Sequence, residues 1–260
     1  MPRALWTGAS GMSAQQTNVD LIANNIANVN TVGFKRQRSD FQDLFYDIVQ
    51  APGARATNAG QNSAGTQLGL GVKLNGTPRI FTEGNLEVTE VQTDLAIEGD
   101  GFFEVTLPDG GSAYTRAGNF RVDADGSLVT PDGLYLNPRI TIPDGTTSIV
   151  VSPTGEVTVT AGNTQSVVGT INLTRFRNPA GLISLGRNLF QETDASGTAQ
   201  TGAPAQNGFG ALRQGALEKA NVEVVTELVG LIVAQRAYET NSKSVRTADE
   251  MMRTANELVR

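Results

Sequence analysis

The residue types that proteins use most often for catalysis are absent from this sequence or scattered along it. Its 260 residues include no cysteine and no histidine. This composition excludes disulfides, thiol nucleophiles, Ser-His-Asp triads and most zinc sites. Two of the 26 acidic residues could meet in the fold at the separation found in glycosidases, but the sequence favours no particular pair. We therefore expect no catalytic residues.

Two short stretches partly match known ligand-binding patterns. Asp123-Ala124-Asp125-Gly126 alternates carboxylates before a glycine, as a calcium loop does, but the later glutamate of such a loop is missing. We interpret it as a hairpin turn. Gly69-Leu70-Gly71 is half of a nucleotide-binding fingerprint without the strand and helix that should flank it. We expect no metal site and no cofactor.

A polar cluster, Gln235-Arg236-Ala237-Tyr238-Glu239, lies in a predicted C-terminal helix. A catalytic interpretation of Tyr238 and Arg236 lacks a partner base. In the structural interpretation Tyr238 lies on the helix seam, and Arg236 and Glu239, at i and i+3, form an ion pair at the surface or between chains. We favour the structural interpretation.

The charge balance excludes several kinds of partner. The net charge is −6 and the sequence pI about 4.8, with basic residues scattered, so we expect no binding to nucleic acid. The longest apolar run, Leu228 to Ala234, is too short to span a bilayer, and we expect no membrane insertion. The first residues lack the apolar core of a cleaved secretory signal. If the protein is exported, we expect another route.

Apolar residues recur every seven positions at both ends of the chain. Near the N-terminus they are Leu5, Met12, Val19 and Ile26. Near the C-terminus they are Leu217, Val224, Leu231, Tyr238, Val245, Met252 and Val259. A companion row of mostly small residues would let a partner helix approach closely: Ala220, Glu227, Ala234, Asn241, Ala248 and Ala255. This period predicts terminal helices, over 1–32 and 217–260, paired as a coiled coil. A helix buried in a globular domain of its own is the alternative.

A single narrow seam stabilises such long segments less than their ordering costs. Further apolar residues lie off the seam, where a solvated helix would not need them: Val222, Val225, Leu228, Val229 and Ile232. We therefore expect the terminal helices to become rigid only when neighbouring subunits cover their other faces.

The middle of the chain has a different pattern. A turn tripeptide recurs as Pro108-Asp109-Gly110, Pro131-Asp132-Gly133 and Pro143-Asp144-Gly145, with short β-prone runs such as Ile140 to Ile142 between turns. We predict a central antiparallel all-β domain over 95–192. The segments 33–94 and 193–216 flank it and contain stretches rich in Gly, Ala and Thr; we predict an extended connecting region there. The fold class is therefore α+β.

Asparagines gather where the first helix should end, in the stretch Ala23 to Gln37. The residues are Asn24, Asn25, Asn28 and Asn30. Asparagine is a weak helix former. Between helices packed side by side, however, its amide can bind neighbouring backbones and fix the axial register. We expect Gly33 to let the chain leave the helix and Phe34 to anchor the connecting region.

Several stretches of the sequence resemble the motifs of a known protein family. The stretch ANNIANVNTVGFK and the run from Ala220-Asn221-Val222 to Asp249-Glu250-Met251 resemble the paired terminal signatures of the bacterial flagellar rod and hook proteins. Gly99 to Phe103 and Tyr114 to Phe120 resemble the β-region motifs of that family. In length and over Tyr46 to Gln67 the chain is most similar to the distal rod members. A proximal rod or hook subunit is the alternative within the family.

The resemblance implies a structural subunit, not an enzyme. Such a subunit is exported unfolded through the flagellar type III apparatus and polymerises with itself into a hollow, rigid helical tube, the drive shaft between motor and hook in the periplasm. Its implied partners are the proximal rod proteins, the hook protein, and the P and L ring proteins around the rod. A wall-cleaving hydrolase and a β binding module with helical tails are the alternatives from other classes.

The residues that we expect at the assembly interfaces combine the heptad rows, the asparagines and the polar cluster. They are Leu5, Met12, Val19, Asn24, Asn25, Ile26, Asn28, Asn30, Gly33, Phe34, Val224, Leu231, Gln235, Arg236, Tyr238, Asn241, Val245 and Met252.

Overall fold

The computed structural model describes residues 3–51, 65–162 and 164–258 and divides into two compact units. The helical unit contains the described residues up to Ile26, those within Gln37–Pro78 and those from Val224 onward. The β unit contains Ala27–Arg36 and Arg79–Glu223. Helices near both ends and antiparallel strands between them make the chain α+β, which confirms the predicted class.

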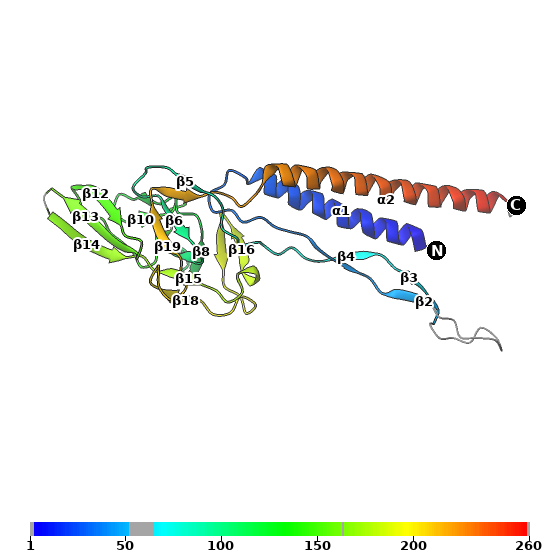
Figure 1. Cartoon of the computed structure of the whole chain (residues 1–260), viewed down its shortest axis with the longest axis horizontal. Coiled ribbons are helices and arrows are strands. Elements are labelled where there is room, and N and C mark those ends of the chain that lie inside the picture. The colour runs from blue at the N-terminus through cyan, green and yellow to red at the C-terminus, as the bar shows by residue number, and fades with distance from the viewer. Residues whose placement is uncertain (1–2, 52–64, 163, 259–260) are drawn as a thin grey trace. The chain divides into compact units, whose positions relative to one another are not determined.

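Two antiparallel helices dominate the helical unit, α1 (Arg3–Ala27) and α2 (Val224–Leu258). Figure 1 shows them side by side, with the start of α1 near the end of α2. Small residues lie at the contact: a Cβ added to Gly8 would lie 2.6 Å from Val245 Cγ2, and one added to Gly11 would lie 2.8 Å from Asn241 Nδ2. The backbones therefore approach more closely than larger side chains would allow.

The row of α2 that faces α1 is the small-residue row. Among the described residues of α2, Glu227, Ala234 and Ala248 are buried, whereas Val224 and Tyr238 of the large apolar row are exposed. The large row lies beside this contact: its Val245 still meets α1 at Gly8, whereas Val224 and Tyr238 lie at the margin.

The predicted start of the C-terminal helix was wrong. Leu217 lies in strand β20 (Ala216–Glu218), which pairs with β5 (Leu86–Val88), and α2 begins at Val224. The backbone around Leu217 is therefore satisfied by a neighbouring strand, not by helical hydrogen bonds. Val259, the last residue of the predicted row, lies outside the described residues.

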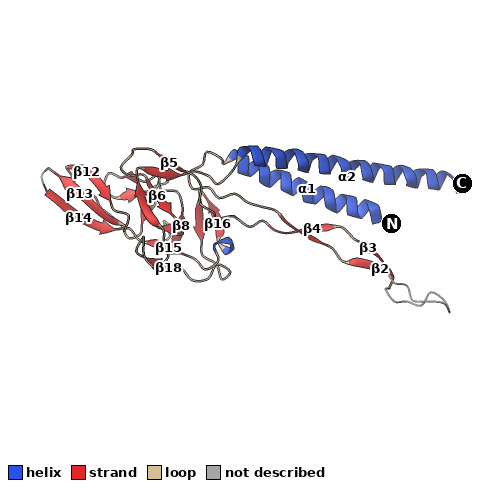
Figure 2. Cartoon of the chain, viewed as in Figure 1, coloured by secondary structure: helices blue, strands red, loops and turns tan. Residues whose placement is uncertain are grey.

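Two short antiparallel ribbons complete the helical unit (Figure 2). In one, β1 (Asp40–Asp43) pairs with β4 (Val72–Gly76), and in the other β2 (Tyr46–Gln50) pairs with β3 (Thr66–Gly69). Val72 N–H donates to Ser10 Oγ at 3.3 Å, and Arg3 forms an ion pair with Asp47. Part of the segment predicted as extended, 52–64, lies outside the described residues.

The β unit is built around a nine-stranded antiparallel sheet in the order β16-β17-β8-β7-β11-β10-β9, with β15 pairing with β7 and β18. Its strands are β7 (Phe102–Thr106), β8 (Ser112–Thr115), β9 (Arg121–Val122), β10 (Leu128–Val129), β11 (Tyr135–Leu136), β15 (Leu173–Arg175), β16 (Ile183–Gly186), β17 (Leu189–Gln191) and β18 (Gln200–Gly202). A three-stranded sheet contains β12 (Thr146–Val151), β13 (Glu156–Ala161) and β14 (Thr164–Thr170). A further pair joins β6 (Leu95–Glu98) to β19 (Ala211–Gln214), and a short 3-10 helix covers Pro179–Gly181.

The core of the β unit is apolar and well buried, with Ile97, Phe103, Leu136, Val157 and Leu173 at its centre. This confirms the central antiparallel β domain, and the glycines of the three predicted Pro-Asp-Gly turns all have positive φ, as such turns require.

Two details of the β prediction differ from the structure. The run 140–142 forms no strand: Ile140 and Ile142 are both buried, but the run makes only one isolated bridge, between Thr141 and Ser127. Strands β5, β18 and β19 and the first residue of β20 lie in the segments predicted as a connecting region, where they pair with other strands of the β unit.

No helix in the described part of the chain combines the length and the apolar character that crossing a membrane requires.

Candidate assembly site

The described residues contain no cluster of three or more acidic side chains arranged as metal ligands. The features that could carry function are of another kind: asparagine-centred clusters, a buried ionic node and an exposed apolar stripe. Each of them lies within one of the two units.

Asn25, on the last turn of α1, holds the backbone of Gln37. Its Oδ1 accepts from Gln37 N–H at 2.9 Å, and its Nδ2 donates to the Gln37 carbonyl at 2.9 Å. The same amide donates to Glu227 Oε2 of α2 at 3.3 Å, and both side chains are buried. Asn25 therefore pairs with Gln37 as a neighbouring strand would, and it joins α1, the segment after it and α2 within one chain.

The other asparagines of this stretch lie in different surroundings. Asn24 is exposed on α1, while Asn28 and Asn30 follow the helix, which ends at Ala27. Asn28 forms a turn: its carbonyl accepts from Thr31 N–H at 3.0 Å and its Oδ1 from Thr31 Oγ1 at 3.2 Å. That Asn24, Asn28 and Asn30 contact neighbouring chains stays a prediction.

Gly33 lies in a turn of the β unit after the helix has ended, not at the helix end as predicted. Its φ is +69°, and a Cβ there would lie 2.6 Å from Ala117 N, so both conformation and space require glycine. Phe34 is buried against Ala220 and Val222. The turn thus packs the N-terminal signature against residues that precede α2.

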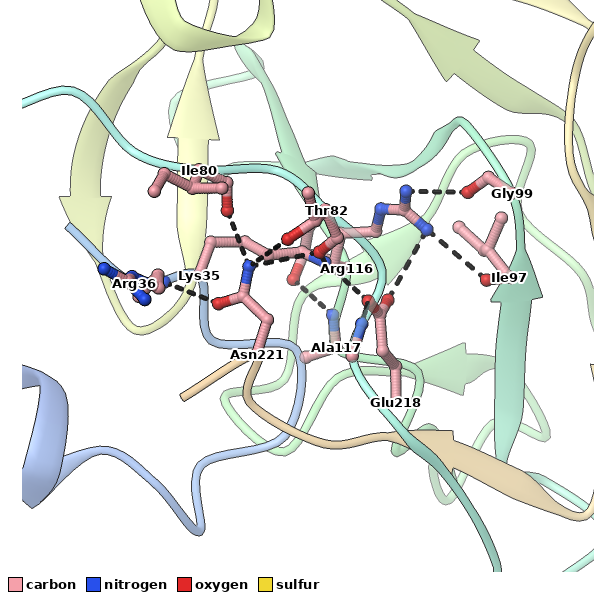
Figure 3. Close-up of polar contacts among 12 residues, drawn as sticks. Lys35, Arg36, Ile80, Thr82, Ile97, Gly99, Arg116, Ala117, Glu218 and Asn221 are labelled. Atoms are coloured by element: carbon pink, nitrogen blue, oxygen red, sulfur yellow. Dashed lines mark hydrogen bonds and ion pairs between the residues drawn. The ribbon is translucent and has the colours of Figure 1, made fainter. Parts of the chain in front are cut away.

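Three charged residues from distant parts of the chain meet in the buried ionic node, defined here as Lys35, Arg116 and Glu218 (Figure 3). Lys35 Nζ pairs with Glu218 Oε1 at 2.5 Å, and Arg116 Nη1 with Glu218 Oε2 at 3.4 Å. Burial lowers the pKa of the Lys35 ammonium and that of the Arg116 guanidinium, and the Glu218 carboxylate acts in the opposite direction on both.

Backbone carbonyls stabilise the remaining positive charge of the node. Lys35 Nζ donates to Thr82 O at 2.7 Å, and Arg116 Nη2 donates to Gly99 O at 2.7 Å. The carboxylate of Glu218 also accepts from Gly84 N–H at 2.8 Å. The node is therefore a fixed arrangement of charges and backbone dipoles, not a solvated ion pair.

Asn221, three residues after Glu218, extends the node (Figure 3). Its Oδ1 accepts from Arg36 N–H at 2.7 Å, and its Nδ2 donates to Ile80 O at 2.8 Å and to Thr82 O at 3.1 Å. Residues just before α2 thereby hold two segments that come from near the N-terminus.

The node residues Arg116 and Glu218 were missed in the sequence, and Lys35 was noted only as part of the stretch Ala23 to Gln37. The heptad spacing predicted a helix from Leu217 onward and so concealed Glu218. Only the structure shows that Ala216 and Glu218 share the buried face of a strand. An acidic residue on the buried face of a strand requires a cationic partner, but nothing in the sequence identifies Lys35 or Arg116 as that partner.

An exposed apolar stripe lies on the first half of α2. It contains Val225, Leu228, Val229, Ile232 and Val233, with exposures between 45% for Leu228 and 70% for Val225. These positions share one face of a helix. Further along the helices, a groove of about 500 Å³ is lined by Gln16 and Val19 of α1 and by Gln235, Tyr238 and Glu239 of α2.

Apart from the four asparagines, the predicted interface residues fall into three groups. On α1 and α2 the half-buried ones are Leu5, Met12, Val19, Ile26, Leu231, Asn241, Val245 and Met252. The exposed ones on α2 are Val224, Gln235, Arg236 and Tyr238. Gly33 and Phe34 are buried in the β unit. The two large apolar rows thus remain at least partly accessible along both helices.

Three family models match successive parts of the chain. The model described as flagella basal body rod protein matches residues 5–35, that of the flagellar hook protein FlgE/F/G D1 domain matches 96–159, and that of the flagellar basal body rod FlgEFG protein C-terminal matches 213–258.

Curated relatives match over the whole length. The flagellar basal-body rod protein FlgG of Borreliella burgdorferi is 49% identical over 100% of both chains, and that of Caulobacter vibrioides is 48% identical over 98% of this chain and 99% of the relative. The flagellar hook protein FlgE of Helicobacter pylori is 48% identical over 52% of this chain but only 19% of its own length.

Proposed function

This chain belongs to the flagellar basal-body rod protein family, and on that premise we propose that it is a structural subunit of the distal rod. Copies of it assemble into a hollow, rigid helical tube that acts as the drive shaft between motor and hook. The subunit is not an enzyme. The full-length match to rod proteins, against a match to only 19% of a hook protein, favours a rod subunit over a hook subunit.

The exposed apolar stripe of α2 is the observation that carries the assembly proposal. A helix surrounded by water would place polar residues at these positions, whereas five large apolar side chains occupy them here. Burial stabilises each such side chain by about 1.5 to 3 kcal/mol. A neighbouring copy that covers the stripe would therefore contribute the stability that the helical unit lacks by itself.

Within the tube, we propose that the terminal helices form the inner core and continue their seam as a coiled coil. The stripe and the groove at Val19 and Tyr238 consist of different residues and follow one another along α2. A contact between the stripe of one copy and the groove of the next is therefore head-to-tail and repeats without closing. The charges fit this arrangement, because exposed Arg236 follows the stripe and Glu239 lies at the groove.

The further partners belong to the same proposal. The tube spans the periplasm and continues from the proximal rod proteins to the hook protein, inside the P and L ring proteins, and its subunits reach it through the flagellar type III export apparatus. What supports these partners is the family to which the chain belongs and the names of its full-length relatives.

A pair of matched substitutions tests the assembly proposal. Val229 on the stripe and Val167 on β14 are each 57% exposed. We expect Val229→Asp to abolish polymer formation by the purified protein, because it places a charge in the buried contact, and Val167→Asp to leave assembly unchanged. Sedimentation and electron microscopy measure the polymer, and restored swimming of a strain lacking its rod protein measures function. Normal polymers and swimming with Val229→Asp would refute the proposal.

A further inference from the structure

The buried ionic node joins parts of the chain that are far apart in sequence. Lys35 and Glu218 are separated by 183 residues, and Arg116 and Glu218 by 102. Lys35 comes from the N-terminal signature, Arg116 follows β8, and Glu218 ends β20. Glu218 is the last of the three to be synthesised, and after it only Lys219 to Glu223 remain to complete the β unit.

Glu218 is also the sole carboxylate in direct contact with the two cations among the described residues. Without it, Lys35 and Arg116 would be two buried like charges in direct contact with carbonyl groups, while the carboxylates of Glu83 and Asp100 act only from a greater distance. Removing one partner of a buried ion pair shifts a folding equilibrium by roughly a hundredfold to several thousandfold.

The node is closed to solvent. The side chains of Lys35 and Glu218 have no exposed surface, and that of Arg116 is 3% exposed. Gly33 packs against the backbone of Arg116 and Ala117 so closely that a Cβ there would collide with it. The charges of Lys35 and Arg116 are therefore compensated mainly by Glu218 and not by bulk water.

The same short segment supplies partners for three backbone amides. Glu218 O accepts from Gly33 N–H at 2.8 Å, Glu218 Oε1 accepts from Gly84 N–H, and Asn221 Oδ1 accepts from Arg36 N–H. These amides lie in two segments that are synthesised long before residue 218. Until residues 218–221 arrive, the three amides lack the partners that they have in the folded state.

We propose that the ionic node is a latch that lets the β unit close only after residues 218–221 have joined it. The segments around Gly33 and Gly84 then stay open in any chain whose C-terminal part is missing or still unfolded. This goes beyond the proposed rod function, and it suits a subunit that must not fold before its export is complete, a purpose that rests on that function.

Pulse-labelling hydrogen exchange during refolding of the full chain tests the order of events. The amides of Gly33, Arg36 and Gly84 report on the latch, and those of Phe103 and Val105 report on the main sheet. We expect the three latch amides to become protected in the same step as residues 216–221, after or together with the sheet. Protection of Arg36 and Gly84 in a step before residues 216–221 would overturn the proposal.

Charge variants of the full chain test the electrostatic part. We expect Glu218→Gln to raise the opening of the β unit roughly a hundredfold or more in native-state hydrogen exchange, at Arg36 and Gly84 as well as in β20. Glu98→Gln is the matched control, because it removes an exposed ion pair with Arg213 on another strand, and it should change exchange less than threefold. A loss of protection confined to residues 216–219 would show a local role and refute the latch.

The double variant Lys35→Met/Glu218→Gln removes one cation together with the carboxylate. We expect the amides of the β unit to exchange no faster in this double variant than in Glu218→Gln alone, because the node then holds only one cation. If the losses of protection from the two single substitutions add in the double variant, the charges of Lys35 and Glu218 are not coupled. If Glu218→Gln does not fold, the refolding experiment on the unmodified chain decides. None of these measurements involves polymer formation, so a failure of the latch and a failure of the rod assignment are distinguishable.

Discussion

At the scale of single residues, asparagine substitutes for a strand partner in this chain. Asn25 satisfies both backbone groups of Gln37 in the helical unit, and Asn221 binds Arg36 N–H and the carbonyls of Ile80 and Thr82 in the β unit. A primary amide carries one acceptor and two donors, which matches the pairing groups of an extended backbone. This explains a weak helix former at the end of α1: part of the asparagine-rich signature acts within its own chain.

Asn25→Ala should destabilise the helical unit by about 2 to 3 kcal/mol, since it leaves two backbone groups of Gln37 and one oxygen of buried Glu227 without this partner. Urea unfolding followed by circular dichroism at 222 nm measures the loss of helix. Asn30→Ala is the matched control: Asn30 is exposed, and we expect a change below about 0.5 kcal/mol. Equal effects of both substitutions would contradict the role of Asn25.

At the scale of elements, small residues decide how α1 and α2 meet. Gly11 lies against Asn241, which shares its row with the buried residues Ala234 and Ala248, and Gly8 lies against Val245 of the neighbouring row. Close approach of the backbones moves the larger Val224 and Tyr238 to the margin of the contact, where a neighbouring subunit can reach them. The geometry of the pair thus sets which apolar side chains are free for assembly.

Alanine substitutions of Gly230 in α2 and Gly8 in α1 should change the stability of the helical unit in opposite directions. Alanine normally stabilises a helix by about 1 kcal/mol relative to glycine. At Gly230 the added Cβ would lie 3.5 Å from Ile22 Cδ1, an ordinary contact, so we expect Gly230→Ala to stabilise the helical unit. At Gly8 the Cβ would lie 2.6 Å from Val245 Cγ2, so we expect Gly8→Ala to destabilise it by about 1 to 3 kcal/mol.

Thermal and urea unfolding of Gly230→Ala and Gly8→Ala measures whether each substitution stabilises or destabilises the helical unit. The rescue variant Gly8→Ala/Val245→Ala removes the collision and should regain most of the lost stability. A stabilising Gly8→Ala would show that the helices do not pack as described.

At the scale of the whole molecule, the two units bury very different cores. The β unit buries large apolar side chains such as Phe103, Phe120 and Leu136 almost completely. In α1 and α2, Ile22 is the one large apolar side chain buried among the described residues, beside alanines and the polar pair Asn25 and Glu227. The helical unit of a single copy is therefore the less stable of the two.

Hydrogen exchange on the monomer and on the polymer should show this difference. We expect amides of α2 in the monomer to exchange about a hundredfold faster than those of β7, and polymerisation to slow α2 while leaving β7 unchanged. Mass spectrometry of labelled peptides measures both. If α2 is protected as strongly as β7 in the dilute monomer, the terminal helices are complete by themselves and the need for neighbouring copies disappears.

Much of the fold could be predicted because it depends on short-range pattern. The heptads at Leu5 to Ile26 and Val224 to Met252 predict helices, since the period of apolar residues follows directly from helix geometry. The Pro-Asp-Gly turns predict hairpins because their conformation is local. The same local patterns were misleading at Leu217, where the heptad spacing continues but the backbone pairs with β5.

The sequence alone determined the α+β class and the exclusion of histidine and cysteine chemistry, because composition and periodicity do not depend on long-range contacts. The resemblance to rod and hook proteins is also read from the sequence, because its motifs are short stretches such as ANNIANVNTVGFK. The tertiary structure alone decided which row of α2 meets α1, since that depends on the interhelical distance at Gly8 and Gly11. It also decided that Lys35, Arg116 and Glu218 share one buried site. Partners separated by up to 183 residues are brought together by strand pairing and turns, and no local pattern encodes that choice.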